Sequence, residues 1–128
     1  MILADTSVVI AYERSRTPRL TQIIQGQSAA VCGITVAEVF TGVRTMADEA
    51  RSVAALGEFQ RLTIPDSLWE TVGRNQARLL AKGVTVQLTD TAIATVAIAN
   101  DVDLWAYDTH FVLIKGVLPR LRLFHEPP

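Results

Sequence analysis

The sequence has a single cysteine, few aromatic residues and no long apolar run. Cys32 has no partner for an internal disulfide, so we expect a small buried side chain. Aromatic residues make up 6% of the chain while 49% is hydrophobic, which favours helices layered on a sheet. No signal peptide is evident, and the longest apolar helix expected has about ten residues, too short for a bilayer. We therefore expect a cytoplasmic protein with no membrane partner.

The sequence also lacks an excess of positive charge and several familiar motifs. Its formal net charge is −1, so a nucleic acid would have to be held by local arginines and metal. No Ser-His-Asp set, P-loop or G-x-G-x-x-G occurs, which leaves acyl transfer, nucleotide hydrolysis and dinucleotide binding without support. Two histidines, His110 and His125, without cysteine partners are too few for a structural zinc site.

Apolar strand-like runs alternate with helical patterns along the chain. Strands are expected at Met1–Ala4, Ala29–Ile34, Arg61–Ile64, Leu104–Tyr107 and Arg120–Phe124. The segment 91–99 is apolar almost all round, so it should form a buried helix. This alternation predicts an α/β fold with a mainly parallel, about five-stranded sheet flanked by helices, in one domain over residues 1–128.

Four carboxylates stand where strands end or helices begin. Asp5 and Asp108 close apolar runs, Glu38 follows the second strand, and Asp90 opens the apolar helix. The carboxyl ends of parallel strands and the following helix N-termini share one edge of a sheet, where ligands bind. Two unit charges ~5 Å apart repel by about 3 kcal/mol at an effective dielectric of ~20. Four convergent acids therefore indicate a site for a divalent cation.

Each acid also has an ordinary structural explanation. Asp5 and Asp108 are possible helix caps, and Asp90 is a first-turn acid that satisfies the helix dipole. Thr35 and Glu38 have the spacing of a capping box. As a set the acids are harder to explain this way, because a buried carboxylate without a partner is costly. We therefore favour the metal site.

Basic residues near these acids are candidate phosphate contacts. Arg14, Arg16 and Arg19 follow the first acid closely, and His110 follows Asp108 by two positions. Arginine suits bidentate contacts to phosphate. A mobile loop and a surface histidine are the competing explanations, and the sequence does not separate them.

Four blocks of the sequence, together with their order, are characteristic as a set: Met1–Ile10, Ile34–Arg44, Asp90–Ala94 and Leu104–Phe111, which cover nearly the whole chain. They resemble the corresponding blocks of PIN-domain proteins, in particular the VapC-type toxins of toxin–antitoxin pairs. The four together are specific, although each alone is weak. The resemblance implies a PIN-like three-layer fold.

The resemblance further implies an Mg²⁺- or Mn²⁺-dependent endoribonuclease whose catalytic acids are Asp5, Glu38, Asp90 and Asp108. Asp5 and Asp90 resemble the principal metal ligands, with Asp108 and Glu38 completing the shell directly or through water. A cognate antitoxin, an RNA substrate and a homodimer are implied as well. Ala106 departs from the family, which often has a hydroxyl residue there, and this change is expected to loosen Asp108.

Two other classes of function stay open at this point. A PIN-like module could bind RNA or protein without cutting it. A small phosphotransfer enzyme is less well supported, because Ser7 stands where a D-x-D phosphatase has its second acid. Lys115, expected in a loop, is also poorly placed for a receiver domain.

Overall fold

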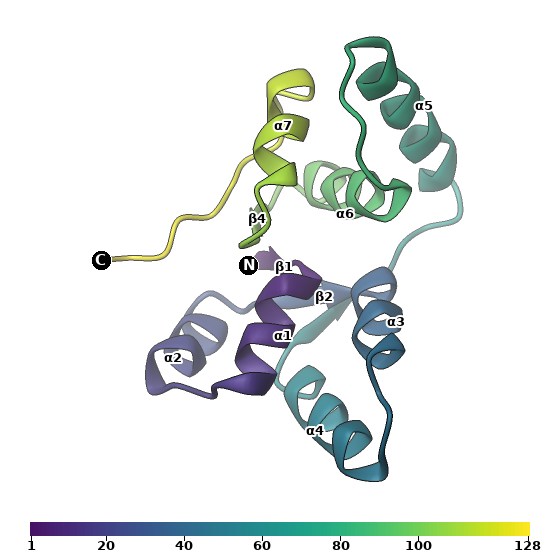
Figure 1. Cartoon of the computed structure of the whole chain (residues 1–128). Coiled ribbons are helices and arrows are strands. Elements are labelled where there is room, and N and C mark those ends of the chain that lie inside the picture. The colour runs from purple at the N-terminus through teal and green to yellow at the C-terminus, as the bar shows by residue number, and fades with distance from the viewer.

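The computed structural model describes all 128 residues and shows a parallel four-stranded sheet with helices on both faces (Figure 1). The order of strands across the sheet is β3 (Gln60–Leu62), β2 (Ala30–Cys32), β1 (Ile2–Ala4) and β4 (Asp103–Trp105). The chain moves outward from β1 to β3 and then returns to the other side of β1. Such a reversal opens a crevice at the carboxyl ends of the strands.

Seven helices connect and cover these strands. They are α1 (Thr6–Arg14), α2 (Pro18–Gly26), α3 (Gly33–Thr41), α4 (Met46–Leu56), α5 (Leu68–Ala81), α6 (Leu88–Ala99) and α7 (His110–Val117). Helices α1, α2 and α4 lie on one side of the sheet, and α5, α6 and α7 lie on the other (Figure 1). None of the helices combines the length and apolarity needed to cross a membrane.

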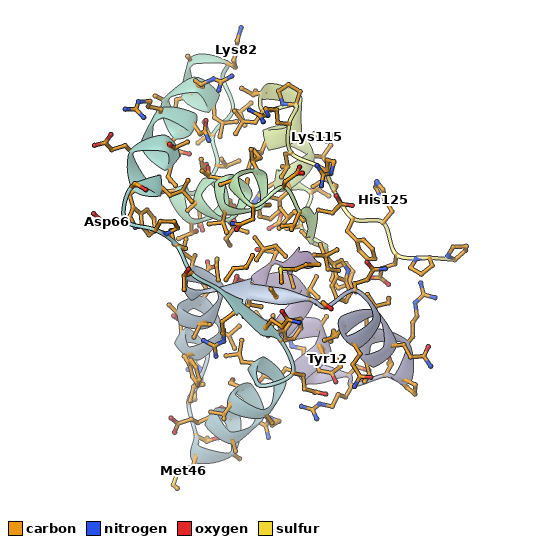
Figure 2. The ribbon with its side chains drawn as sticks, turned by 180° about the vertical axis from the view of Figure 1, so that it is seen from behind. Tyr12, Met46, Asp66, Lys82, Lys115 and His125 are labelled. Carbon is orange, nitrogen blue, oxygen red and sulfur yellow. The ribbon has the colours of Figure 1, made fainter.

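Strand β1 is buried on both faces, as its uniformly apolar sequence predicts. Ile2 and Ala4 pack into the core beneath α1, α2 and α4, whereas Leu3 packs into the core beneath α5, α6 and α7. Alternate side chains of a strand point to opposite faces, so one short strand joins both cores. Met46 and Lys82 mark the outer tips of the two helical layers (Figure 2).

Helix α6 is buried as predicted, and buried hydrogen bonds join it to α5. Every residue from Thr91 to Ala97 is buried. Asn75 of α5 donates to Thr95 Oγ1 at 3.0 Å, and that hydroxyl donates to the Thr91 carbonyl at 2.7 Å. These bonds fix the axial position of α6, and with it the position of Asp90 in the first turn.

The predicted fifth strand, Arg120–Phe124, is wrong. Only Leu123 pairs with β4, in an isolated parallel bridge to Leu104. Leu104 donates to the Arg122 carbonyl at 2.8 Å and accepts from the Phe124 N–H at 2.7 Å. The segment lies between Pro119 and Pro127, which have no N–H to extend the ladder.

The segment after β4 was expected to be a loop, but residues 110–117 form helix α7, which contains Lys115. Phe111 and Ile114, one helical turn apart, are its two buried residues. An eight-residue helix with so short an apolar pattern is stabilised by tertiary packing and not by propensity. Its first residue, His110, is brought toward the carboxyl ends of the strands.

We predict that Thr95→Val destabilises the protein by about 1–3 kcal/mol, because Asn75 is left buried with an unsatisfied amide. The double variant Asn75→Leu/Thr95→Val should be less destabilised than the sum of its two single variants, since both partners are then removed. Urea unfolding of the four proteins measures this coupling. Strictly additive losses would contradict the structural role given to this bond.

Candidate active site

Asp5 lies directly after β1 and is almost fully buried, with 4% of its surface exposed. It is the N-cap of α1, as its position in the sequence suggested, and its Oδ2 accepts from the Ser7 N–H at 3.1 Å. The Ser7 hydroxyl donates to the same oxygen at 2.8 Å. Burial raises the pKa of Asp5, and the hydrogen bonds from Ser7 oppose that rise. The Thr6 backbone N–H also acts to lower this pKa.

Asp90 and Asp108 come together around His110. The imidazole Nδ1 lies 3.4 Å from Asp90 Oδ2 and 3.2 Å from Asp108 Oδ1. The backbone N–H of His110 also donates to Asp108 Oδ1 at 2.9 Å. Burial raises the pKa of Asp90, the charges of Asp5 and Asp108 raise it further, and His110 opposes them. Glu38 adds a smaller contribution in the same direction, so all four predicted acids act on one another electrostatically.

Glu38 lies at the rim of this group, and its predicted capping box with Thr35 is not formed. Strand β2 passes directly into α3, whose N-cap is Cys32, so Thr35 is already helical and fully buried without a hydrogen-bond partner. Glu38 is consequently in the second turn of α3. Its Oε1 accepts from the Thr6 hydroxyl at 2.7 Å. The side chain therefore faces α1 and not its own helix end.

The donor chemistry fits a hard divalent cation, although the carboxylates are not arranged around one. Asp5, Asp90 and Asp108 supply only oxygen atoms, the ligands preferred by Mg²⁺ and also suited to Mn²⁺. Burial is the main cause of the raised pKa of both Asp5 and Asp90, and a bound cation would favour their charged forms. No three His, Cys, Asp or Glu side chains form a ready-made ligand set. Coordination would therefore require these side chains to move closer together.

Two contacts that sequence reasoning missed support the loop carrying Asp108. The Tyr107 N–H donates to the Ser7 hydroxyl at 3.0 Å, and the Asp5 N–H donates to the Trp105 carbonyl at 2.8 Å. This loop is held through Ser7 in a chain in which Ala106 offers no hydroxyl. No local pattern in the sequence links Ser7 to a residue 100 positions away.

The three arginines near the first acid differ in their contacts. Arg16 pairs with Glu58 at 3.0 Å and lies over the Tyr12 ring, 5.2 Å from its centre. Arg19 pairs with Glu126 at 3.5 Å. Arg14 makes no ion pair, which makes it the one free cation of the set.

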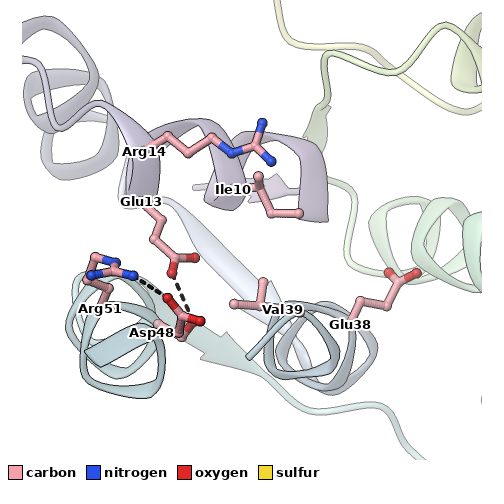
Figure 3. Close-up of a pocket in the computed structure, with 9 residues that line it drawn as sticks. Ile10, Glu13, Arg14, Glu38, Val39, Asp48 and Arg51 are labelled. Atoms are coloured by element: carbon pink, nitrogen blue, oxygen red, sulfur yellow. Dashed lines mark hydrogen bonds and ion pairs between the residues drawn. The ribbon is translucent and has the colours of Figure 1, made fainter. Parts of the chain in front are cut away.

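Arg14 and Glu38 line the same groove, a cavity of about 390 Å³ between α1, α3 and α4. Figure 3 shows the Arg14 guanidinium extending over Ile10, while the Glu13 and Asp48 carboxylates lie together beside Arg51. Asp48 is paired with Arg51, and Glu13 accepts from Ser52 at 3.0 Å. The groove therefore leads from a free guanidinium to one of the predicted catalytic acids.

The raised pKa of Asp90 predicts that the ionised carboxylate makes the folded protein less stable. A carboxyl whose folded pKa exceeds its unfolded value makes folding less favourable as pH rises through that interval. In EDTA at neutral pH, the free energy of unfolding of Asp90→Asn should therefore exceed that of wild type by roughly 0.5–2 kcal/mol. The variant should accordingly melt at a higher temperature. The difference should shrink as pH falls toward the ordinary value of 3.8. Calorimetry of Asp90→Asn and of the control Asp66→Asn, which changes an exposed carboxylate outside the cluster, measures this difference. Equal changes in stability in the two variants would refute the prediction.

Comparison with known proteins places this geometry in context. The sequence matches the PIN domain over residues 2–117. A chain of VapBC2 from Rickettsia felis, bound to a DNA fragment from their promoter, is similar with a TM-score of 0.84 and 18% identity, covering 97% of this chain and 98% of that chain. DNA-bound VapBC from Salmonella typhimurium gives 0.81 at 18% identity, covering 97% and 98%. VapBC-5 from Mycobacterium tuberculosis gives 0.66 at 24%, covering 90% of each chain.

No curated protein sequence gives a significant match. The structural likenesses, all at low sequence identity, establish the fold. The family match is more informative, because it spans all four candidate acids and both helical layers. PIN domains are generally nucleases and typically depend on divalent metal. On the match over residues 2–117, this chain belongs to the PIN domain family.

Proposed function

We propose that this chain, as a single domain over residues 1–128, is a metal-dependent endoribonuclease and the toxin of a type II toxin–antitoxin pair. The observation that carries the proposal is the convergence of Asp5, Asp90 and Asp108 on one edge of the sheet, with Glu38 at its rim. Hydrogen bonds within the chain hold Asp5, Asp108 and Glu38. Asp90 lies 3.4 Å from His110 Nδ1 through its Oδ2.

Asp5, Asp90 and Asp108 are the proposed ligands of Mg²⁺ or Mn²⁺. A bound divalent cation would supply positive charge for the phosphate oxygens and acidity for an attacking water. Asp5 contributes a fixed position, because Ser7 and the Trp105 carbonyl hold its side chain and backbone. Asp108, with a side chain 37% exposed, has the freedom to adjust toward the ligand set.

Glu38 is the proposed group that receives a proton from the attacking water, with Asp108 as the alternative. The Thr6 hydroxyl occupies Glu38 Oε1, so Oε2 is available for this purpose. The water oxygen attacks phosphorus in line and its proton passes to the carboxylate. The bond from phosphorus to the 3′-oxygen breaks, and that oxygen takes up a proton from solvent water. Arg14 is placed to hold a neighbouring phosphate, because it shares the groove with Glu38 and has no ion-pair partner.

Partners and location belong to the same proposal. A structural neighbour from Mycobacterium tuberculosis is described as a member of the VapBC family of toxin–antitoxin systems, and others are likewise toxin–antitoxin complexes. These likenesses support a cognate antitoxin that covers the active site. We place the protein in the cytoplasm as a homodimer, consistent with an RNA substrate.

We expect discrete cleavage of total cellular RNA by the purified protein in Mg²⁺, measured by end mapping. EDTA should abolish the products because it removes the metal, and Asp5→Asn should abolish them because it removes a ligand. The control Asp66→Asn should cleave normally. Circular dichroism should show that Asp5→Asn is folded, because asparagine is also a good N-cap. Unchanged cleavage by Asp5→Asn would sink the assignment, and bound but intact RNA would point to a non-cleaving module.

Arg14→Ala should raise KM by about five- to tenfold with little change in kcat, as expected for a lost phosphate contact. The salt dependence of RNA binding should also decrease by about one ion. Arg16→Ala is the matched control, because its guanidinium is already engaged with Glu58 and Tyr12. Equal effects of the two variants would show that Arg14 acts only through general charge.

A further inference from the structure

A shallow aromatic pocket at the end of β4 includes Tyr107, the residue before Asp108, and has no role in the function proposed so far. Its volume is about 410 Å³, and its lining residues are Trp105, Ala106, Tyr107, Phe124, His125 and Glu126. The walls therefore come from the end of β4 and from the C-terminal segment that runs beside it. His125 lies on that segment, on the outside of the molecule (Figure 2).

The pocket is internally braced through Glu126. Its Oε2 accepts from the Trp105 indole at 3.1 Å and from the Tyr107 hydroxyl, and its Oε1 pairs with Arg19 at 3.5 Å. The rings of Tyr107 and Phe124 both pack edge-on against Trp105, at 6.3 and 5.8 Å between centres. Burial and Glu126 raise the pKa of Tyr107, so its hydroxyl stays protonated as a donor. The Tyr107 ring is thus held in place although 46% of the residue is exposed.

Tyr107 also connects this pocket to the candidate catalytic acids. Its N–H donates to the Ser7 hydroxyl, which in turn donates to Asp5, and Asp108 is the next residue. A group resting on the Tyr107 ring would therefore lie near whatever occupies the carboxylate cluster. A nucleotide chain can occupy both places at once, because each of its phosphates is linked through a sugar to a base.

The chemistry of the pocket favours a base over a phosphate. Glu126 is negative, and the nearby Arg19 is already paired with it, so no free cation is offered to a phosphate. An exposed and immobilised aromatic ring is instead a stacking surface, which suits the uncharged face of any base. We propose that this pocket binds a nucleobase of single-stranded RNA beside the scissile phosphate, with Tyr107 as the stacking residue. The inference rests on the proposed function and names a substrate contact within it.

The test uses full-length Asp5→Asn protein and an eight-nucleotide single-stranded RNA of mixed sequence. The fluorescent base 2-aminopurine is placed at successive positions, since stacking on an aromatic ring quenches its emission. We expect quenching at one or two adjacent positions on binding. Adding Tyr107→Ala should remove that quenching and weaken binding by about fivefold or more.

Three further variants separate stacking from structural support. Tyr107→Phe keeps the ring and loses the bond to Glu126, so it should retain both quenching and affinity. Glu126→Gln tests the brace itself and should leave the quenched position unchanged. Trp69→Ala is the matched control, because Trp69 is 44% exposed but lies on α5 and lines a different cavity.

Three results would overturn the inference while leaving the nuclease intact. The first is cleavage by the wild-type protein without position-specific quenching in the Asp5→Asn complex. The second is an equal loss in Tyr107→Phe and Tyr107→Ala, which would assign the effect to the brace. The third is RNA affinity that Tyr107→Ala leaves unchanged, which would reject an RNA role for this pocket. Absence of both RNA binding and cleavage would reject the proposed function together with this inference.

Discussion

The burial of a carboxylate at the end of the central strand is the constraint on which the rest of the site depends. Asp5 is nearly inaccessible, yet no positively charged side chain within the chain pairs with it. Its negative charge is stabilised only by hydrogen bonds from the first residues of α1 and by the dipole of that helix. A buried charge with so little compensation is costly. The fold therefore holds electrostatic strain at the place where its chemistry is proposed.

The contacts around Asp5 relieve part of that strain and at the same time arrange its neighbours. Ser7 binds Asp5 on one side and the Tyr107 backbone on the other, so the same hydroxyl supports the loop that carries Asp108. His110 lies between Asp90 and Asp108 and separates two carboxylates that repel each other. Glu38 reaches the group from a third direction through Thr6. The acids are thus positioned by polar side chains that are individually unremarkable in sequence.

Much of this arrangement was predictable because it follows from local patterns. Apolar strands that end in an acid, and an apolar helix that begins with one, place Asp5 and Asp90 at one edge of any parallel sheet. The features that sequence reasoning missed depend on contacts between distant segments. Helix α7 is fixed by the burial of Phe111 and Ile114, and the role of His110 follows from that helix. The capping box failed because β2 enters α3 without a turn, a geometry that the spacing of Thr35 and Glu38 does not report.

The connection between Ser7 and Tyr107 also has a consequence for the order of events during synthesis. The two residues are 100 positions apart, and β4 pairs with β1 only after the intervening strands and helices have been made. Contacts of such long range form late, because the loop they close is long. A nascent chain that has exposed only Asp5, Glu38 and Asp90 has no second wall for the site. The carboxylate cluster is therefore complete only after β4 and the loop that carries Asp108 have been synthesised and have packed against β1.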